Sequence, residues 1–170
     1  MRSYPKVRSA DLPAASRLSS SYERTDFADA FSVDLPEAAS SDAEAIARHV
    51  FEQQPAWIAT LMGIRDRLVQ PFDLKRSADL QAAGGDRISI FRVFERCEDE
   101  IILGEDDLHL DFRVSVLLRP TSEGRPRRLI VTTLVFYKHP LGRAYIALIA
   151  PFHRLVVRTS LKQAQKRGWP

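Results

Sequence analysis

The sequence of 170 residues has one cysteine, Cys97, only seven glycines, and no long apolar run. A single cysteine excludes an intrachain disulfide, so the fold does not require an oxidising compartment. The longest apolar run, from Ala144 to Phe152, is far shorter than the roughly 20 residues that a membrane-spanning helix needs. Charged residues interrupt the first 15 positions, where a signal peptide would carry an apolar segment. We therefore expect a cytoplasmic protein that is not integral to a membrane.

The motifs of common catalytic and cofactor sites are also missing. No nucleophile elbow, phosphate-binding loop or dinucleotide-binding glycine pattern is present, so we expect no cofactor. A lone cysteine and histidines without a short spacing disfavour zinc, and the acidic run 105–107 lacks the ligand spacing of a calcium loop. Glu95, Glu98 and Asp99 flank Cys97 and are expected to raise the pKa of its thiol. The sequence thus predicts neither a metal site nor a nucleophilic cysteine.

Charge is nearly balanced overall, with 25 Lys and Arg against 22 Asp and Glu, but it is unevenly distributed. Residues 95–111 contain eight acidic residues and one arginine, whereas residues 139–170 contain six basic residues and no acidic one. This asymmetry favours pairing within the molecule over a polyanionic partner. A basic cluster, formed by Arg119 and residues 125–128, falls on a predicted hairpin tip. Glu123 lies in the same tip and reduces its positive charge. We expect no nucleic-acid binding.

A content of 45% apolar and 28% charged residues is typical of one globular domain. Residues 1–25 are predicted to form an extended lead-in, with at most a short strand at 6–8, and residues 26–170 a single domain. Alternating apolar residues predict a first strand at 27–35, in which Asp29 breaks the pattern. Ser41 and Glu44 form a capping box that begins a helix at 42–54. Pro55 is predicted to begin a second helix that ends before Pro71.

After a predicted loop at 73–87, the spacing of apolar residues changes from the helical period of 3.6 to the strand period of two. Strands are predicted at 88–96, 100–103, 108–118 and 128–138, and their short connections favour an antiparallel meander. A long amphipathic helix is predicted at 141–167, with Pro151 causing a kink or break near 147–151. We expect one apolar stripe of this helix to cover the sheet, formed by Leu141, Tyr145, Leu148, Ile149, Phe152, Leu155 and Val156. The fold class that follows is α+β.

The strand at 108–118 places four polar residues in one row, because its even positions are apolar and its odd positions are His109, Asp111, Arg113 and Ser115. One interpretation is the solvated face of an ordinary antiparallel strand. The other is a row that faces a cavity, in which Asp111 orients His109 or pairs with Arg113 to bind an anion or move a proton. In the second case Thr133 and Tyr137 of the neighbouring run would accompany the row. That run, 129–137, is apolar on both faces, so both are covered by protein or by a partner.

Several motifs together resemble the bacterial family catalogued as domain of unknown function 2867. They extend from about Asp26 to Lys162 and comprise Pro55-x-Trp57, residues 61–66, residues 104–115, Leu141-Gly142-Arg143-x-Tyr145 and residues 151–154. That family is similar to the START-like, or helix-grip, superfamily. The resemblance implies a curved antiparallel sheet, usually of seven strands, around a long C-terminal helix and an apolar cavity. Members of the superfamily bind lipids, polyketides or hormones, and some are cyclases or hydratases.

The leading functional hypothesis is a helix-grip domain that binds a small apolar or amphipathic, lipid-like molecule between sheet and terminal helix. The candidate ligand-binding residues are His109, Asp111 and Arg113 as polar anchors, with Tyr137, Tyr145 and His153 at the opening. A second hypothesis is an enzyme of cyclase, dehydratase or isomerase type, with His109 as general base, Asp111 orienting it and Arg113 stabilising negative charge. A third is an interaction module that forms a homodimer through residues 131–135.

Overall fold

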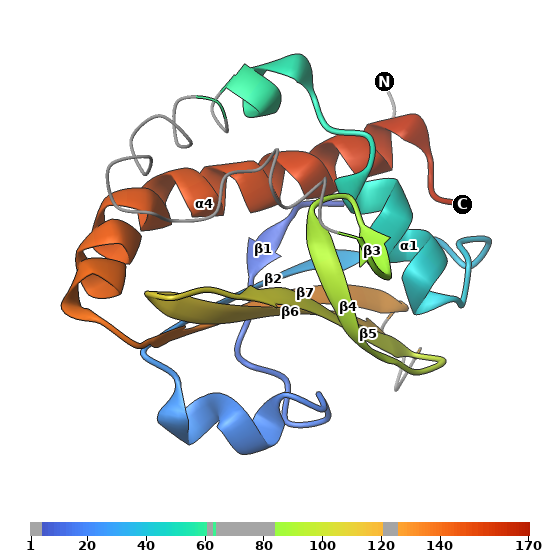
Figure 1. The fold of residues 1–170 in the computed structure, drawn as a ribbon. Helices are drawn as coiled ribbons and strands as arrows, with labels where there is room; N and C mark the ends of the chain where they lie inside the picture. Colours follow the sequence, from blue (N-terminus) through green and yellow to red (C-terminus); the bar gives the residue numbers. More distant parts are fainter. Residues whose placement is uncertain (1–4, 61–62, 64–83, 121–125) are drawn as a thin grey trace.

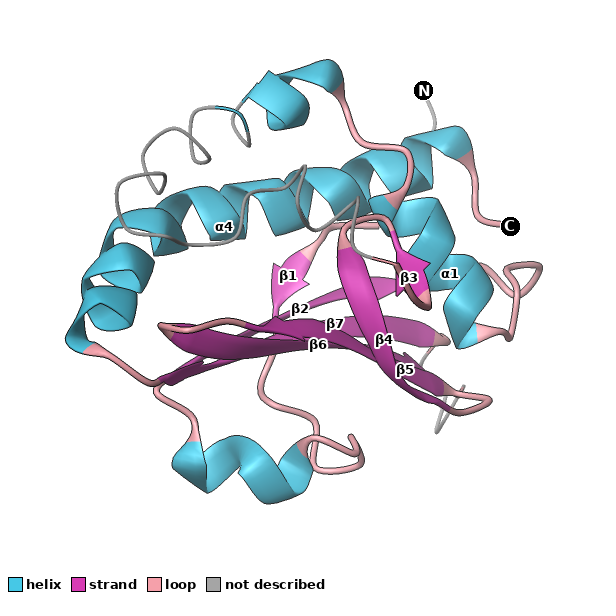
Figure 2. Ribbon diagram, viewed as in Figure 1, coloured by secondary structure: helices cyan, strands magenta, loops and turns pink. Residues whose placement is uncertain are grey.

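A seven-stranded antiparallel sheet and a long C-terminal helix dominate the fold (Figure 1, Figure 2). The computed structural model describes residues 5–60, 63, 84–120 and 126–170, and in this part the strand order is β1-β2-β7-β6-β5-β4-β3. The elements are β1 (Arg8–Ser9), the 3₁₀ helix η1 (Ser19–Arg24), β2 (Phe27–Asp34), α1 (Ala43–Phe51), β3 (Arg87–Ile88), β4 (Phe91–Arg96), β5 (Glu100–Asp106), β6 (Leu110–Arg119), β7 (Arg128–Tyr137) and α4 (Pro140–Arg167). This is the predicted α+β class, with a helix-grip-like arrangement.

The predicted meander is confirmed, with differences at its ends. Strands β4 to β7 pair in sequence order, and β2 joins the sheet beside β7. Strand β5 continues to Asp106 instead of ending at residue 103, because its last residues pair with the start of β6. The two-residue strands β1 and β3 complete the seven. Residues 56–60 are helical as predicted after Pro55, while most of that helix and most of the 73–87 loop lie outside the described residues.

The two faces of the sheet are covered by different parts of the chain. We call the face that packs against α1 and α4 the inner face; it includes Val33, Leu103 and Val131 in the main apolar core. The opposite, outer face carries Ile102 and Leu134, which pack with Leu18 and Tyr22 of the N-terminal lead-in. Figure 1 shows the lead-in on the side of the sheet away from α4. The lead-in is therefore not simply an extended tail, since its 3₁₀ helix closes a second small core.

This arrangement explains why the run 129–137 is apolar on both faces. Strand β7 lies between β2 and β6, and it is covered on the inner and outer faces by elements of the same chain. Val131 and Val135 are buried, at 1% and 3% exposure. The interaction hypothesis expected an exposed dimer surface at residues 131–135. This expectation is wrong, because these residues are buried within the chain.

Helix α1 begins one residue later than the predicted capping box requires. Its N-cap is Asp42, whose extended backbone lets the carboxylate accept the Glu44 N–H at 2.9 Å. The buried side of the helix consists of Ala43, Ile46, Ala47, Val50 and Phe51, all in the main core. The helical spacing of these apolar residues therefore predicted the contact face correctly.

Helix α4 packs through a different face from the one predicted. Its buried residues are Gly142, Val157, Ser160, Leu161, Ala164 and Gln165. Three residues of the predicted stripe are exposed instead, with values of 59% for Leu148, 46% for Phe152 and 53% for Leu155. Small side chains on the contact face let the helix backbone approach its neighbours closely, which a face of leucines would prevent. Pro151 lies inside the helix without ending it, and the first turns run at a steep angle to the remainder (Figure 1).

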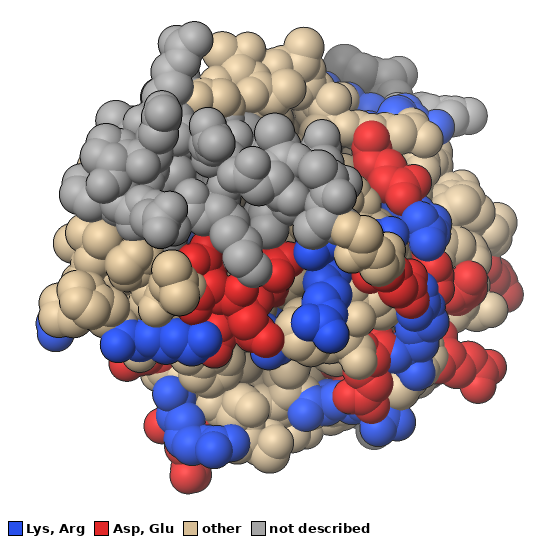
Figure 3. Space-filling model, viewed as in Figure 1, with Lys and Arg blue, Asp and Glu red and all other residues tan. Residues whose placement is uncertain are grey.

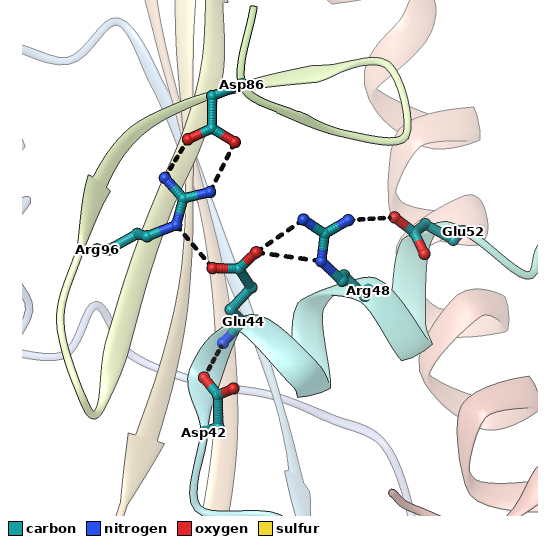
Figure 4. Close-up of polar contacts among 6 residues, drawn as sticks. All are labelled: Asp42, Glu44, Arg48, Glu52, Asp86 and Arg96. Atoms are coloured by element: carbon teal, nitrogen blue, oxygen red, sulfur yellow. Dashed lines mark hydrogen bonds and ion pairs between the residues drawn. The ribbon is translucent and has the colours of Figure 1, made fainter.

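Arginines and carboxylates connect α1 to the strands at its side (Figure 4). Arg96 of β4 donates to Glu44 at 2.6 Å and to Asp86, which precedes β3, at 2.6 Å. Arg48 donates to Glu44 at 2.7 Å and to Glu52 at 2.7 Å. Glu44 therefore accepts from both guanidinium groups and joins the two pairs into one chain of charges.

This charge chain predicts a stability difference that depends on pH and salt. Arg96 and, second, Arg48 lower the pKa of Glu44 in the folded state. A lowered carboxyl pKa stabilises the fold above the unfolded value and loses this contribution as the pH falls through the folded value. In urea unfolding at low salt, Arg96→Gln should thus lower stability modestly at pH 7, and the difference should shrink at pH 3 and with added salt. A difference that persists unchanged at pH 3 would contradict the assignment.

Candidate functional site

The polar row of β6 lies on the outer face of the sheet. Val114 and Val116 take the inner face and join the main core, so the alternation of the strand directs Asp111, Arg113 and Ser115 away from α4. The Arg113 guanidinium lies over the Phe94 ring, 3.7 Å from its centroid, and donates to Asp106 at 2.7 Å. Of the two interpretations of this row, the structure does not support the one in which it faces a space closed by the terminal helix.

The three residues of the proposed catalytic row have separate partners. Asp111 pairs with Lys138, whose Nζ lies 2.6 Å from Oδ1, whereas Arg113 pairs with Asp106. His109 precedes β6, and its ring lies 5.5 Å from that of His139 between centroids. The carbonyl of His109 accepts the backbone N–H groups of Lys138 and His139. These contacts tie the β5–β6 turn to the start of α4.

Thr133 and Tyr137 do not accompany the row. Thr133 is the register partner of Val114, and Tyr137 is that of Leu110, so both belong to the inner face. Directly paired residues of neighbouring strands point to the same side of a sheet. Tyr137 therefore lies on the same side as α4, which carries Tyr145 and His153.

An acidic residue that the motif search missed lies on this inner face. Asp29 of β2 is paired in register with Thr133, and its side chain is 10% exposed. His153 of α4 places Nε2 at 3.3 Å from Asp29 Oδ1, and Arg154 places Nε at 3.7 Å from Oδ2. The His153 ring also meets Phe27 edge to face, with centroids 6.2 Å apart. The Asp29–His153 pair therefore connects the sheet to the helix just after Pro151.

One oxygen of this carboxylate has no hydrogen-bond donor among the described residues. Asp29 Oδ2 is buried and has no hydrogen bond to the described residues, since the Arg154 contact at 3.7 Å exceeds hydrogen-bond length. A buried carboxylate oxygen without a donor is costly, because it loses water and gains no partner. This atom is the strongest indication of a ligand contact in the described part of the chain.

Tyr137 and Tyr145 lie near the beginning of α4. Burial raises the pKa of Tyr137, Asp26 raises it further, and Arg143 opposes this effect. The phenol of Tyr137 is therefore protonated at neutral pH and able to donate a hydrogen bond. Tyr145 is half-buried on the helix. Among the predicted site residues, Tyr137, Tyr145 and His153 thus share the α4 side, whereas Asp111 and Arg113 do not.

The first half of α4 packs less closely on the protein than the second half. Gly142 is its one fully buried residue before Val157, and Ile146, Ile149 and Ala150 are half-buried. Gly142 marks a backbone contact, because a Cβ at this position would overlap the His109 carbonyl oxygen. The helix is therefore anchored at residue 142 and again from residue 157, with half-buried apolar side chains between.

Comparison with known protein families identifies the chain. The model of the family described as "Protein of unknown function (DUF2867)" matches residues 21–160. The chain belongs to this family. No curated protein and no solved structure matches it. The matched part of this DUF2867 chain includes Asp29 and His153, but the lead-in before residue 21 and the last turns of α4 lie outside it.

The outer face of the DUF2867 sheet contains a second buried carboxylate. Glu100 is 2% exposed, and its Oε1 accepts the hydroxyls of Ser16 and Ser115, each at 2.5 Å. Its Oε2 accepts the Arg17 backbone N–H at 2.8 Å. This contact fixes the lead-in to β5 and β6, and we call it the Glu100 clamp. All three donors come from the protein, so the clamp has a structural rather than a ligand-binding geometry.

Cys97 and the possible metal ligands among the described residues are further candidate sites in this DUF2867 chain. Burial raises the pKa of the Cys97 thiol and Glu95 adds to the effect, so the thiolate is disfavoured. Among the described residues, no three His, Cys, Asp or Glu side chains form a metal-binding group, and no helix is long and apolar enough to cross a membrane. On the face shown in Figure 3, basic and acidic side chains are interspersed. Acids of the 95–111 segment pair with bases outside α4, namely Arg17, Arg87, Arg113 and Lys138.

Proposed function

We propose that this DUF2867 domain binds a small, mostly apolar molecule between the first half of α4 and the inner face of the sheet. The observation that carries the proposal is Asp29 Oδ2, a buried carboxylate oxygen without a hydrogen bond to the described residues. Half-buried Ile146 and Ile149 supply apolar contacts nearby on the helix. A few polar groups in an apolar setting are typical of ligand sites.

The charges around Asp29 determine which ligand fits best. His153 and Arg154 already lie on the two oxygens of the carboxylate, so an additional cation would be repelled by the Arg154 guanidinium. An anion would be repelled by Asp29 itself. A neutral hydroxyl or amide donor satisfies Oδ2 without either conflict. The Tyr137 phenol lies on the same face of the sheet, four residues along β7 from Thr133, the register partner of Asp29. We therefore assign the ligand to the class of neutral lipid-like molecules with one hydrogen-bond donor.

The START-like resemblance supports this proposal through an analogy of architecture alone. Proteins of that superfamily hold apolar molecules between a curved sheet and a long C-terminal helix. The same elements surround Asp29 here, with β2 and β7 on one side and α4 on the other. The Asp29–His153 pair also has the composition of an acid–base pair, so a bound substrate with an acidic proton would meet a base at this position.

A pair of probe molecules that differ in one donor tests the proposal. We expect 1-octanol to bind about tenfold more tightly than heptyl methyl ether in isothermal titration calorimetry, because only the alcohol donates to Asp29. Asp29→Leu should remove this preference by deleting the acceptor. Asp34→Leu, on the same strand but on the outer face, is the matched control and should retain it. A preference for the alcohol that survives in Asp29→Leu, or equal binding of both probes to the wild type, would refute the site.

A further inference from the structure

Three large apolar side chains form an exposed stripe on the outward side of α4. Leu148, Phe152 and Leu155 are spaced by four and three residues, which places them on one face of the helix. Their exposed fractions lie between 46% and 59%. Large contiguous apolar surface on a folded domain marks a place of contact with another apolar phase or partner.

The same helical face becomes basic toward its C-terminal end. Continuing the spacing of the stripe leads to Lys162 and Lys166, which are both exposed. These two lysines and Lys6 line a surface groove of about 400 Å³, which also includes Pro5, Val7 and Gln165. Beyond Pro151, the part of this face from Phe152 to Lys166 extends about 21 Å along an ideal helix. The outward face of α4 thus has an apolar half and a basic half.

The charge of the helix as a whole is one-sided. From Pro140 to Arg167 it contains six Lys and Arg residues and no Asp or Glu. Two copies of the chain that paired through this face would therefore bring like charges together, which disfavours a homodimer. A nucleic acid would find the lysines but would leave the apolar half uncovered. An anionic lipid surface has both components, with phosphate head groups for the lysines and acyl chains for the leucines and phenylalanine.

From this complementarity we propose that the outward face of α4 docks on an anionic lipid membrane. Leu148, Phe152 and Leu155 enter the boundary between head groups and acyl chains, while Lys162, Lys166 and Lys6 contact lipid phosphates. This surface is distinct from the proposed ligand site, because His153 and Val157 belong to the opposite, sheet-facing side of the helix. The membrane proposal therefore does not require the ligand proposal to be correct.

Vesicle co-sedimentation of the full chain tests the docking surface. We expect binding to vesicles of phosphatidylcholine mixed with phosphatidylglycerol, weak binding to phosphatidylcholine alone, and a loss of binding as salt increases. Replacing Lys162 and Lys166 by Gln should weaken binding to the anionic vesicles about twenty- to thirtyfold, given about 1 kcal/mol per basic residue at such a surface. The triple change Leu148→Ser, Phe152→Ser and Leu155→Ser should weaken it at least about a hundredfold.

Matched control variants distinguish binding through this surface from nonspecific adsorption to vesicles. Leu108→Ser removes the apolar residue of the β5–β6 turn, which is 70% exposed, and should leave vesicle binding unchanged. A double Arg24→Gln and Arg119→Gln variant removes two exposed charges outside α4 and should also bind normally. Circular dichroism confirms that each variant is folded. Equal binding to both vesicle types, no binding to either, or a dimer that the triple serine variant converts to a monomer would overturn the proposal.

Discussion

Glu100→Ala should cost about 3 to 5 kcal/mol of folding stability, the largest effect that we expect from a single side chain. The alanine leaves two buried hydroxyls, those of Ser16 and Ser115, and the part-buried N–H of Arg17 without their acceptor. Removing one partner of a buried, charge-assisted set costs more than the net value of the hydrogen bonds, because the remaining groups stay dehydrated. For a domain of this size the loss corresponds to a fall in Tm of about 10 °C.

Urea and thermal unfolding of Glu100→Ala measure this effect directly. Glu98→Ala is the matched control, since Glu98 lies two residues earlier in the exposed β4–β5 turn and should change stability by less than about 0.5 kcal/mol. A second readout follows from the position of the clamp. Limited proteolysis should cut the lead-in of Glu100→Ala faster than that of the wild type, because the clamp holds residues 16 and 17 against the sheet. Equal stability of Glu100→Ala and Glu98→Ala would show that the clamp is not significant.

Gly142→Ala should destabilise the protein by about 3 kcal/mol through a backbone clash. A Cβ at this position overlaps the His109 carbonyl oxygen and comes within 3.2 Å of the carbonyl carbon. The carbonyl cannot rotate away freely, because it already accepts from Lys138 N and His139 N. The start of α4 must therefore move off the β5–β6 turn, and overpacking of this kind typically costs a few kcal/mol.

The matched control for this substitution is Gly63→Ala. Gly63 is also helical, and a Cβ there meets no atom within 4 Å, so alanine should be neutral or stabilising through its helix propensity. Differential scanning calorimetry of both variants gives the comparison. Because Gly142 anchors the first half of α4, Gly142→Ala should also weaken octanol binding if the proposed ligand site is correct. A Tm of Gly142→Ala equal to that of Gly63→Ala would show that the helix start moves without cost.

Local patterns were sufficient to predict most of the fold. The alternation of apolar and polar residues predicted β2, β4, β6 and β7 to within a few residues. The helical spacing of apolar residues predicted α1 and the extent of α4. The short strand expected at 6–8 corresponds to β1 at Arg8–Ser9, and β3 was not separated from the strand predicted at 88–96, since a two-residue strand has no measurable period. The orientation of α4 was also wrong, because hydrophobicity alone gives the most apolar face. The observed contact face contains small residues such as Ser160 and Ala164, which let the backbone of α4 approach its neighbours closely.

The candidate site was predicted only in part. Tyr137, Tyr145 and His153 share the α4 side in the structure, and their position at the opening of a ligand site is still a prediction. The sequence left open whether the polar row faces a cavity or solvent, because alternation gives the two faces of a strand but not which of them the helix covers. The sequence did mark Asp29, because it is the one acidic residue among the odd-numbered positions of β2, which are otherwise apolar. Its pairing with His153 depends on a contact between residues 124 positions apart, which no local pattern contains.

The pairing of β2 with β7 has a consequence for how the chain folds. Phe27 meets Val135, so the first long strand must wait for a partner that is synthesised roughly a hundred residues later. Contacts of such sequence separation impose a large loop-closure cost and are associated with slow folding. During translation the residues of β4 to β6 emerge before β7, the strand that joins β2 to the rest of the sheet. Until then Phe31 and Val33 are uncovered, and nascent chains released early are the species most prone to aggregate.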